Sequence, residues 1–193
     1  MMRRLFTILL VFNVSLAFAQ KADSVSAKAT KTKNVDGTLM SSSKDLIDNL
    51  SASPQFTTLV KALNAAGLAE NLKTNTITFF APTNLAFDKL PTGMLDTLLL
   101  PSRKTDLINL INYHAVQGKV TSKDIERQIK AGNGQAMLST LSGGTLTARI
   151  NGNRNIVITD ENGGESIVTR LDIGQSNGML FIINNVLQPK AKQ

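Results

Sequence analysis

Residues 78–87 read TFFAPTNLAF, a stretch that joins two kinds of secondary structure. Its first half, with Ile77 before it, is apolar and rich in aromatic and β-branched residues, which predicts a buried strand. Pro82 cannot donate a backbone hydrogen bond to a neighbouring strand, so we expect the strand to end there. Thr83 and Asn84 follow, and residues of these types commonly cap helices. The stretch therefore predicts a core strand that turns directly into a short helix.

The sequence on the two sides of this stretch differs in character. Apolar residues at helical spacing are frequent in residues 45–131, for example Phe56 and Leu59. Residues 134–187 contain runs rich in β-branched residues, separated by glycine and asparagine turns. Because most helices come first and most strands come later, we predict an α+β domain in which the early strand joins the late ones.

The N-terminus has the pattern of an export signal. A short positive region with Arg3 and Arg4 precedes a mostly apolar run, and Ala17-Phe18-Ala19 has the small-residue pattern of a cleavage site. We interpret residues 1–19 as a secretory signal peptide and expect a secreted or periplasmic protein. No later stretch approaches the roughly 18 uninterrupted apolar residues of a membrane span. We therefore expect no membrane span after cleavage and, since the chain has no cysteine, no lipoprotein anchor.

Residues 20–44 are poor in large apolar side chains and rich in Lys, Ser, Ala and Thr. Such a composition is typical of a flexible segment, because it offers little apolar surface to bury. We therefore expect a flexible leader over residues 20–44 and one folded domain over residues 45–190.

The composition also excludes several classes of site. With no cysteine and one histidine, the chain has no disulfide, no cysteine zinc site and no multi-histidine metal site, so we expect no metal or cofactor. The formal net charge of +7 falls to +5 when Arg3 and Arg4 are removed, and the remaining excess is spread along the chain. Nucleic-acid-binding proteins usually cluster such charge on one element, so no nucleic-acid partner is expected.

Three segments together resemble the fasciclin domain family. They are residues 78–87, the Tyr113-His114 pair, and residues 177–187, which open with Asn177-Gly178. In the first segment the likeness is carried by Thr78, Phe80, Ala81, Pro82, Thr83, Asn84 and Phe87. The resemblance covers residues 45–190 and implies a wedge made of a small β-sandwich with helices packed along one side. It also implies an extracellular, non-enzymatic module for adhesion or matrix contact.

The third segment departs from the family pattern. Many members have a histidine in its middle and an aspartate after it, where this chain has Phe181 and Asn184. Animal members have a proposed receptor-contact Asp-Ile pair just before the closing Asn-Gly, and Asp172-Ile173 occupies that place, which makes it a candidate partner contact. The residues around the pair do not match those adhesive motifs. This favours a structural role, with Ile173 in the core and Asp172 bonded to backbone at a strand end.

Tyr113 and His114 are the only tyrosine and histidine of the chain, and they have two interpretations. His114 could be the general base of a small secreted hydrolase, although no G-x-S-x-G motif accompanies it. Apolar spacing in a helix predicted over residues 102–116 places His114 on the buried face, which favours a structural hydrogen bond. We therefore expect no catalytic residue.

The sequence favours an exported, non-enzymatic binding or adhesion module. Its expected partners are surface polysaccharide or extracellular or envelope protein. A periplasmic carrier of a small hydrophobic ligand is the main alternative, and a hydrolase that uses His114 is a weaker one. A closed apolar pocket would favour the carrier, and an exposed His114 near a serine hydroxyl would favour the hydrolase. The binding surface and the oligomeric state stay open.

Overall fold

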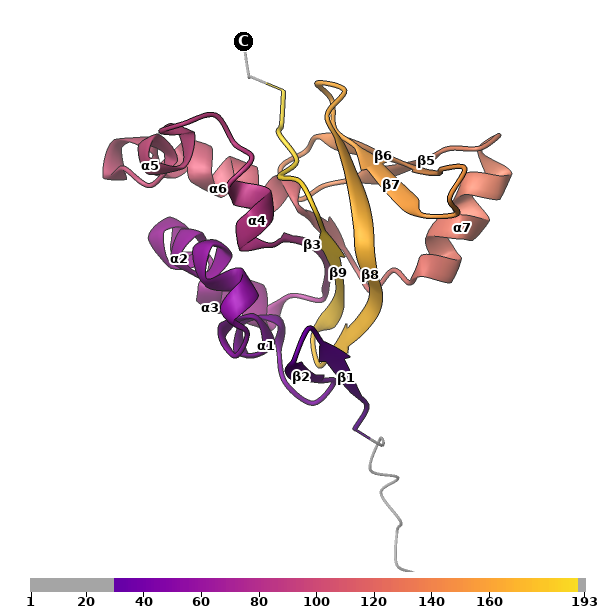
Figure 1. Cartoon of the computed structure of the whole chain (residues 1–193), viewed down its shortest axis with the longest axis horizontal. Helices are drawn as coiled ribbons and strands as arrows, with labels where there is room; N and C mark the ends of the chain where they lie inside the picture. The colour runs from indigo at the N-terminus through magenta and orange to yellow at the C-terminus, as the bar shows by residue number, and fades with distance from the viewer. Residues whose placement is uncertain (1–29, 191–193) are drawn as a thin grey trace, which may run out of the picture.

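The structure is a computed structural model that describes residues 30–190, so the predicted signal peptide lies outside the described residues. No helix in this range combines the length and the apolar character needed to cross a membrane. The elements, drawn in Figure 1, follow in this order: β1 (Thr32–Val35), β2 (Thr38–Ser41), α1 (Leu46–Ser51), η1 (Pro54–Phe56), α2 (Thr57–Ala66), α3 (Ala69–Thr74), β3 (Ile77–Pro82), α4 (Asn84–Phe87), α5 (Met94–Leu98), η2 (Pro101–Arg103), α6 (Lys104–Tyr113), β4 (Ala115–Gln117), α7 (Ser122–Ala131), β5 (Ala136–Ser139), β6 (Thr145–Ile150), β7 (Ile156–Thr159), β8 (Glu165–Gln175) and β9 (Gly178–Ile183).

The strands form a seven-stranded sheet, in the order β4-β3-β9-β8-β7-β6-β5, and a separate hairpin, β1-β2. Neighbours in the large sheet are antiparallel except β3 and β9, which are parallel. The long strand β8 shifts register twice against β9, and such irregularities bend a strand. A bridge between Val116 and Thr140 connects the β4 and β5 ends of the sheet. The sheet therefore folds over on itself as a small sandwich.

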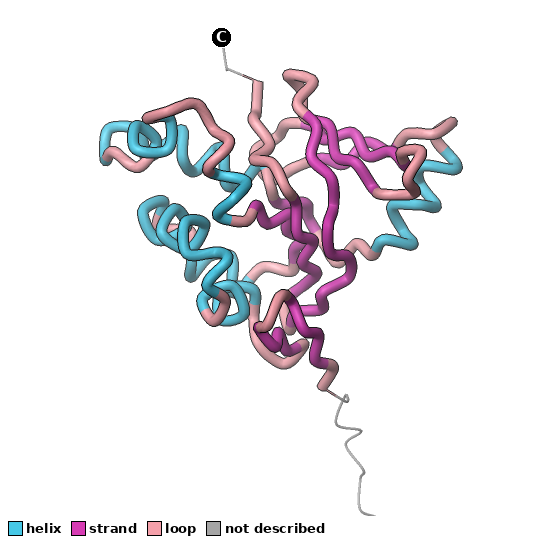
Figure 2. Tube along the Cα trace, in the orientation of Figure 1, coloured by secondary structure: helices cyan, strands magenta, loops and turns pink. Residues whose placement is uncertain are grey.

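The side chains of β3 alternate between two hydrophobic cores, as the pleat of a strand requires. Phe79 and Ala81 belong to the core under helices α1–α6, whereas Phe80 belongs to a second core with β5–β7 and α7. Phe80 stacks on Phe181 of β9 with the ring centroids 5.5 Å apart. Figure 2 shows the resulting layers, with most helices on one side of the central strands. The predicted α+β wedge is confirmed.

The segment of residues 78–87 folds as predicted. Every residue of β3 is buried, and α4 begins directly after Thr83. The Thr83 side chain caps α4 by accepting a hydrogen bond from the Ala86 N–H at 3.3 Å. Asn84 is the first residue of α4, and its side chain bonds to the start of α2 instead of capping α4. One residue of the predicted pair therefore caps this helix.

The prediction of a flexible leader up to residue 44 is wrong for residues 32–41. These residues form the β1-β2 hairpin, whose turn contains Asp36 and Gly37, both with positive φ, as in a type I′ turn. Val35 and Met40 are buried, and the Asn49 side chain accepts from the N–H of Ser41 and donates to its carbonyl oxygen, both at 2.9 Å. Two buried side chains and the hydrogen bonds of Asn49 thus order a segment that is otherwise polar.

The helix predicted over residues 102–116 is shorter than expected. It ends at Tyr113, and residues 115–117 form β4 instead. The pairing of β4 with β3 places Val116 opposite Thr78, so sheet hydrogen bonds replace the last helical turn. His114 is the residue after the helix, and it is buried as predicted.

Candidate functional site

His114 is buried, and both of its ring nitrogens are bonded to backbone. Nδ1 lies 2.8 Å from the carbonyl oxygen of Leu110, and the N–H of Leu187 donates to Nε2 at 3.0 Å. Because Nε2 accepts, the proton of the neutral ring is on Nδ1 and is donated to Leu110. Burial lowers the pKa of His114 to about 4, so the ring is neutral near pH 7. Neither hydrogen-bond partner is a serine hydroxyl, which the histidine of a Ser-His-Asp triad would need.

Tyr113 joins the end of α6 to two turns of the sandwich. Its hydroxyl donates to the carbonyl oxygen of Thr145 at 3.1 Å and accepts from the N–H of Glu161 at 3.0 Å. Burial raises the pKa of Tyr113 to about 12. The ring packs closely against Gly144, where a Cβ would lie 2.7 Å from Cε2 of the ring. The Tyr113-His114 pair therefore connects α6 to the sandwich and to the C-terminal segment.

The polar residues of the first family segment also bond to distant backbone. Thr78 donates to the carbonyl oxygen of Gly118 and accepts from the N–H of Val120, both at 2.8 Å. Asn84 accepts from the N–H of Thr58 at 3.0 Å. These bonds tie β3 to the loop after β4, and α4 to α2. The apolar residues that carry the family likeness in this segment, Phe80, Ala81, Pro82 and Phe87, are buried.

Asn177, directly before β9, also bonds to backbone groups that are distant in sequence. The Asn177 side chain accepts from the N–H of Leu46 at 3.0 Å and donates to the carbonyl oxygen of Leu72 at 2.7 Å. Gly178 pairs with Ile77, and a Cβ on Gly178 would lie 1.8 Å from the Ile77 carbonyl oxygen. We call the five polar motif residues that bond to distant backbone the backbone clamps: Thr78, Asn84, Tyr113, His114 and Asn177.

Asp172-Ile173 lies within β8 and not at a strand end, which corrects that detail of the prediction. Ile173 is buried in the core under the helices. Asp172 has a φ of +53° at an irregularity of the strand. Its two carboxylate oxygens accept from the backbone N–H and the hydroxyl of Ser122, at 2.7 and 2.5 Å. The carboxylate therefore holds the first residue of α7, and the bond to backbone is present as expected.

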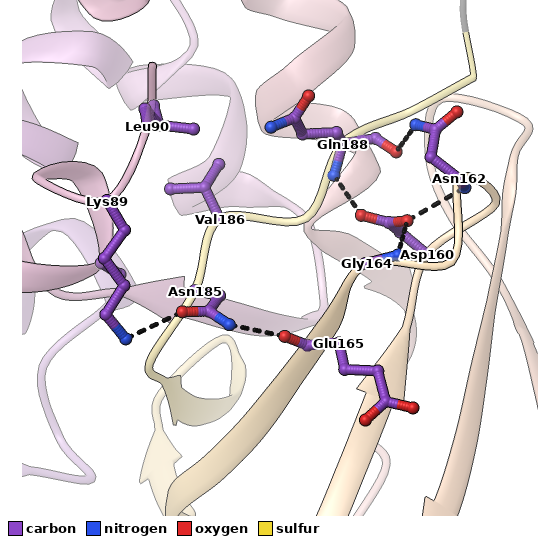
Figure 3. A pocket seen from close by; sticks show the side chains of 10 residues that line it. Lys89, Leu90, Asp160, Asn162, Gly164, Glu165, Asn185, Val186 and Gln188 are labelled. Atoms are coloured by element: carbon purple, nitrogen blue, oxygen red, sulfur yellow. Dashed lines mark hydrogen bonds between the residues drawn. The ribbon is translucent and has the colours of Figure 1, made fainter. Parts of the chain in front are cut away.

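A hollow of about 510 Å³ lies between α4 and the turn that joins β7 to β8 (Figure 3). Lys89 donates to the side-chain oxygen of Asn185 at 2.8 Å, and Asn185 donates to the carbonyl oxygen of Glu165 at 2.6 Å. Asp160 accepts from the N–H of Gln188 at 2.9 Å. These bonds latch the C-terminal segment to the sandwich. Because these polar groups bond to one another and to the backbone, we assign the lining of the hollow a structural role.

A second depression, which we call the Leu85 groove, has about 680 Å³ of space. Leu85 on α4 is 73% exposed there, and an ion pair of 2.6 Å between Arg170 and Asp36 lies at the groove. Singly exposed apolar side chains are common on protein surfaces, so it is the concave shape around Leu85 that makes this groove a candidate contact surface. The lining residues are Asp36, Pro54, Gln55, Thr83, Asn84, Leu85, Lys89, Thr169, Arg170, Ile183 and Asn184.

The sequence does not single out Leu85, because leucine is among the residues most often buried in a core. The position becomes recognisable only when α4 is seen to be a single short turn whose buried residues are Ala86 and Phe87. Within residues 30–190, no group of three or more His, Cys, Asp or Glu side chains is placed to hold a metal ion.

Several known proteins are similar to this chain in sequence. Protein sll1483 of Synechocystis is 33% identical over 149 residues, which cover 77% of this chain and 75% of that protein. Immunogenic protein MPB70 of Mycobacterium bovis is 30% identical over 146 residues, which cover 73% and 67% of the two chains. Transforming growth factor-beta-induced protein ig-h3 of Sus scrofa is 32% identical over 149 residues, and the match covers 77% of this chain but only 20% of that larger protein.

A solved structure has the same fold. It is the FAS1 domain pair from the insect cell adhesion molecule fasciclin I, with a TM-score of 0.63 and 18% identity. The match covers 77% of this chain and 51% of that chain, so this chain spans about half of the pair. The family model of the fasciclin domain matches residues 54–189. The chain therefore belongs to the fasciclin domain family.

Proposed function

We propose that this protein is an exported, non-enzymatic binding and adhesion module that contacts surface polysaccharide or extracellular or envelope protein. The class of function is supported by the family match and by a fold neighbour that is a cell adhesion molecule. The structural observation that carries the proposal is the Leu85 groove, which exposes a large apolar side chain on a concave surface.

The Leu85 groove combines the chemical elements of a protein-binding surface. Leu85 supplies an exposed apolar contact in the groove. Arg170, Asp36 and Lys89 add charged groups around the apolar area. Protein interfaces commonly place charged and polar groups around an apolar centre. An extracellular or envelope protein is therefore the partner that we assign to this groove.

The state of His114 supports a role without chemistry. A general base must reach the proton that it removes, and it must be able to exchange that proton near the working pH. His114 is 3% exposed, both its nitrogens are bonded to backbone, and its pKa is about 4. These properties weigh against the hydrolase alternative. A carrier of a small hydrophobic ligand would need a closed apolar pocket. The Leu85 groove does not favour that alternative, because Leu85 is exposed to solvent.

The groove assignment can be tested with two matched substitutions. Leu85→Asp places a charge in the groove, whereas Met137→Asp places one on β5, where the side chain is 74% exposed. A tagged protein of residues 20–193 and both variants would be incubated with envelope and culture fractions of the producing cells, and captured proteins would be identified by mass spectrometry. Affinity for each captured protein, made pure, would then be measured by interferometry.

We expect Leu85→Asp to weaken a specific partner by about tenfold or more, as for a central interface residue, with Met137→Asp and the melting temperature unchanged. Equal affinities of the two variants for every captured protein would refute the groove as the binding surface. Capture of no protein by the unaltered chain, together with no binding to a glycan array, would refute the binding function itself.

A further inference from the structure

A third concave site, a pocket of about 600 Å³, lies where the β1-β2 hairpin meets β8. We call it the lysine pocket, and its lining residues are Lys31, Thr32, Lys33, Met40, Ser42, Lys119, Asp172, Gly174 and Met179. It shares none of its lining residues with the Leu85 groove. Its volume is within the range of about 300–1,000 Å³ that is usual for ligand pockets. The pocket is therefore a separate site with room for a few residues of an extended ligand.

The fold gathers three lysines that the sequence separates. Lys31 and Lys33 are two residues apart, so they project to the same face of the hairpin. Lys33 is paired across the hairpin with Met40, and the N–H of Lys31 donates to the hydroxyl of Ser42. Lys119 comes from the loop after β4. These three ammonium groups share one concave surface only because the hairpin is ordered against the sandwich.

The positive charge of the lysine pocket is not neutralised by its surroundings. The ion pairs among residues 30–190 involve other basic residues. Lys33 donates to the carbonyl oxygen of Leu171, a neutral group, and its ammonium carries two further hydrogens. Asp172, the one acidic residue of the lining, already accepts two hydrogen bonds from Ser122. Three lysines against one aspartate leave the pocket with a net positive charge.

The rest of the lining narrows the class of ligand. Thr32 and Ser42 offer hydroxyl groups, and the almost fully buried Met40 and Met179 supply apolar surface. Hydroxyls, an apolar floor and cations match the hydroxyls, C–H faces and anionic groups of an acidic sugar chain. The lining has no aromatic ring on which a nucleic-acid base could stack. A flat bilayer would meet the rim of a concave site and not its interior.

We propose that the lysine pocket binds an acidic polysaccharide, a chain of sugars that carry carboxylate or sulfate groups. This inference rests on the proposed function only in placing the protein where such polysaccharides occur, and it does not depend on the Leu85 groove. The chain's own segment of residues 20–29 has two lysines and one aspartate, so its charge is not complementary to the pocket.

Binding of the protein of residues 20–193 to immobilised polygalacturonate tests this proposal. Fully methyl-esterified polygalacturonate keeps the sugar backbone but removes the charge, and dextran sulfate replaces carboxylate with sulfate. We expect binding to one or both charged polymers and none to the ester. Lys31→Gln, Lys33→Gln and Lys119→Gln together should raise the Kd by about tenfold or more, since each exposed ion pair contributes a few-fold.

Three exposed lysines on helices, Lys61, Lys104 and Lys130, provide the matched control. Their replacement by glutamine removes the same charge elsewhere and should leave the Kd within about twofold, because distant exposed charges are screened by salt. Arginine at positions 31, 33 and 119 keeps the charge and should keep binding, even if the glutamine variant loosens the hairpin.

Three results would overturn the proposal: no binding to either charged polymer, an equal loss of affinity in the control variant, or stronger binding to phosphatidylglycerol vesicles or single-stranded DNA than to both polymers. None of these results affects capture of a protein by the Leu85 groove, so the two proposals can fail separately.

Discussion

Two of the backbone clamps, Tyr113 and His114, differ from the two surface sites in burial and in hydrogen bonding. The clamps include the only tyrosine and the only histidine of the chain, and these two side chains are buried with their polar atoms bonded. The Leu85 groove and the lysine pocket are lined by common residue types, and Leu85 and the three lysines among them are exposed. The comparison teaches that a rare residue in a shared motif can mark architecture, while ordinary residues form the surface available to partners.

Gly178→Ala is the substitution expected to have the largest effect on the buried residues of this comparison. The new Cβ would collide with the backbone oxygen of Ile77, 1.8 Å away, and the central β3–β9 pair would have to separate there. We expect a loss of about 4 kcal/mol or more in the free energy of unfolding, since backbone cannot yield as a side chain can. Gly174→Ala, whose Cβ would meet Ser42 at an ordinary 3.7 Å, is the control. Similar urea midpoints for the two variants would contradict the close approach.

His114→Ala should cost about 2–4 kcal/mol, because it removes two buried hydrogen bonds and leaves a cavity. The chain has no tryptophan and one tyrosine, so fluorescence of the neighbouring Tyr113 can follow denaturant unfolding of this variant. Gln117→Ala, an exposed change on β4, should be nearly neutral. An unaltered unfolding midpoint for His114→Ala would show that the hydrogen bonds of His114 do not stabilise the fold.

The pH dependence of stability separates a buried neutral histidine from an exposed one. The folded-state pKa of about 4 lies below the ordinary value of 6.5, so the unfolded chain binds a proton between these values that the folded chain does not. The stabilisation is complete above pH 6.5 and falls by up to about 3 kcal/mol as the pH drops to 4. His114→Gln lacks this titration, so we expect a shallower pH dependence in thermal unfolding. Parallel curves for the two proteins would show an exposed His114.

Tyr113→Phe keeps the packed ring and removes only the hydroxyl. The N–H of Glu161 and the carbonyl oxygen of Thr145 each lose a partner, for which we expect a cost of about 1–3 kcal/mol. Circular dichroism is the suitable measurement, because the variant has neither tyrosine nor tryptophan. A cost below that of an exposed substitution would mean that water replaces the hydroxyl.

The smallest effect on stability is expected from substitutions in the lysine pocket. Replacing Lys31, Lys33 and Lys119 with glutamine should change the free energy of unfolding by less than about 0.5 kcal/mol per site, as for surface substitutions in general. The same protein should lose affinity for the acidic polymer. If the loss of affinity were accompanied by an equally large loss of stability, these lysines would be structural residues and not ligand contacts.

The architecture was largely predictable because its signals are local. Pro82 and Thr83 mark a strand end and a helix start regardless of what surrounds them, and glycine and asparagine turns separate the late strands. The hairpin was not predicted, although Asp36-Gly37 is a hairpin signal, because its order depends on Asn49 and on the burial of Val35 and Met40. Those contacts are set by tertiary packing, which no short window of sequence contains.

The surface sites could not be predicted for a related reason. The sequence shows the charges of Lys31, Lys33 and Lys119, but their convergence depends on a hairpin, a loop and a bent strand meeting at one place. The exposure of Leu85 depends on α4 being one turn long. Burial of His114 was predicted from helical spacing, yet its bond to Leu187 spans 73 residues, and such a partner has no local signature.

The order of strands in the sheet has a consequence for how the chain is made. β9 is the last of the described strands to be synthesised, yet it lies between β3 and β8 and is buried along its whole length. A nascent chain that stops before residue 178 has no partner for the exposed edge of β3, and the bond between Asn177 and Leu46 closes a separation of 131 residues. Contacts so distant in sequence form slowly. The central sheet is therefore completed only after β9 has been synthesised, so this domain cannot finish folding strand by strand from its first elements.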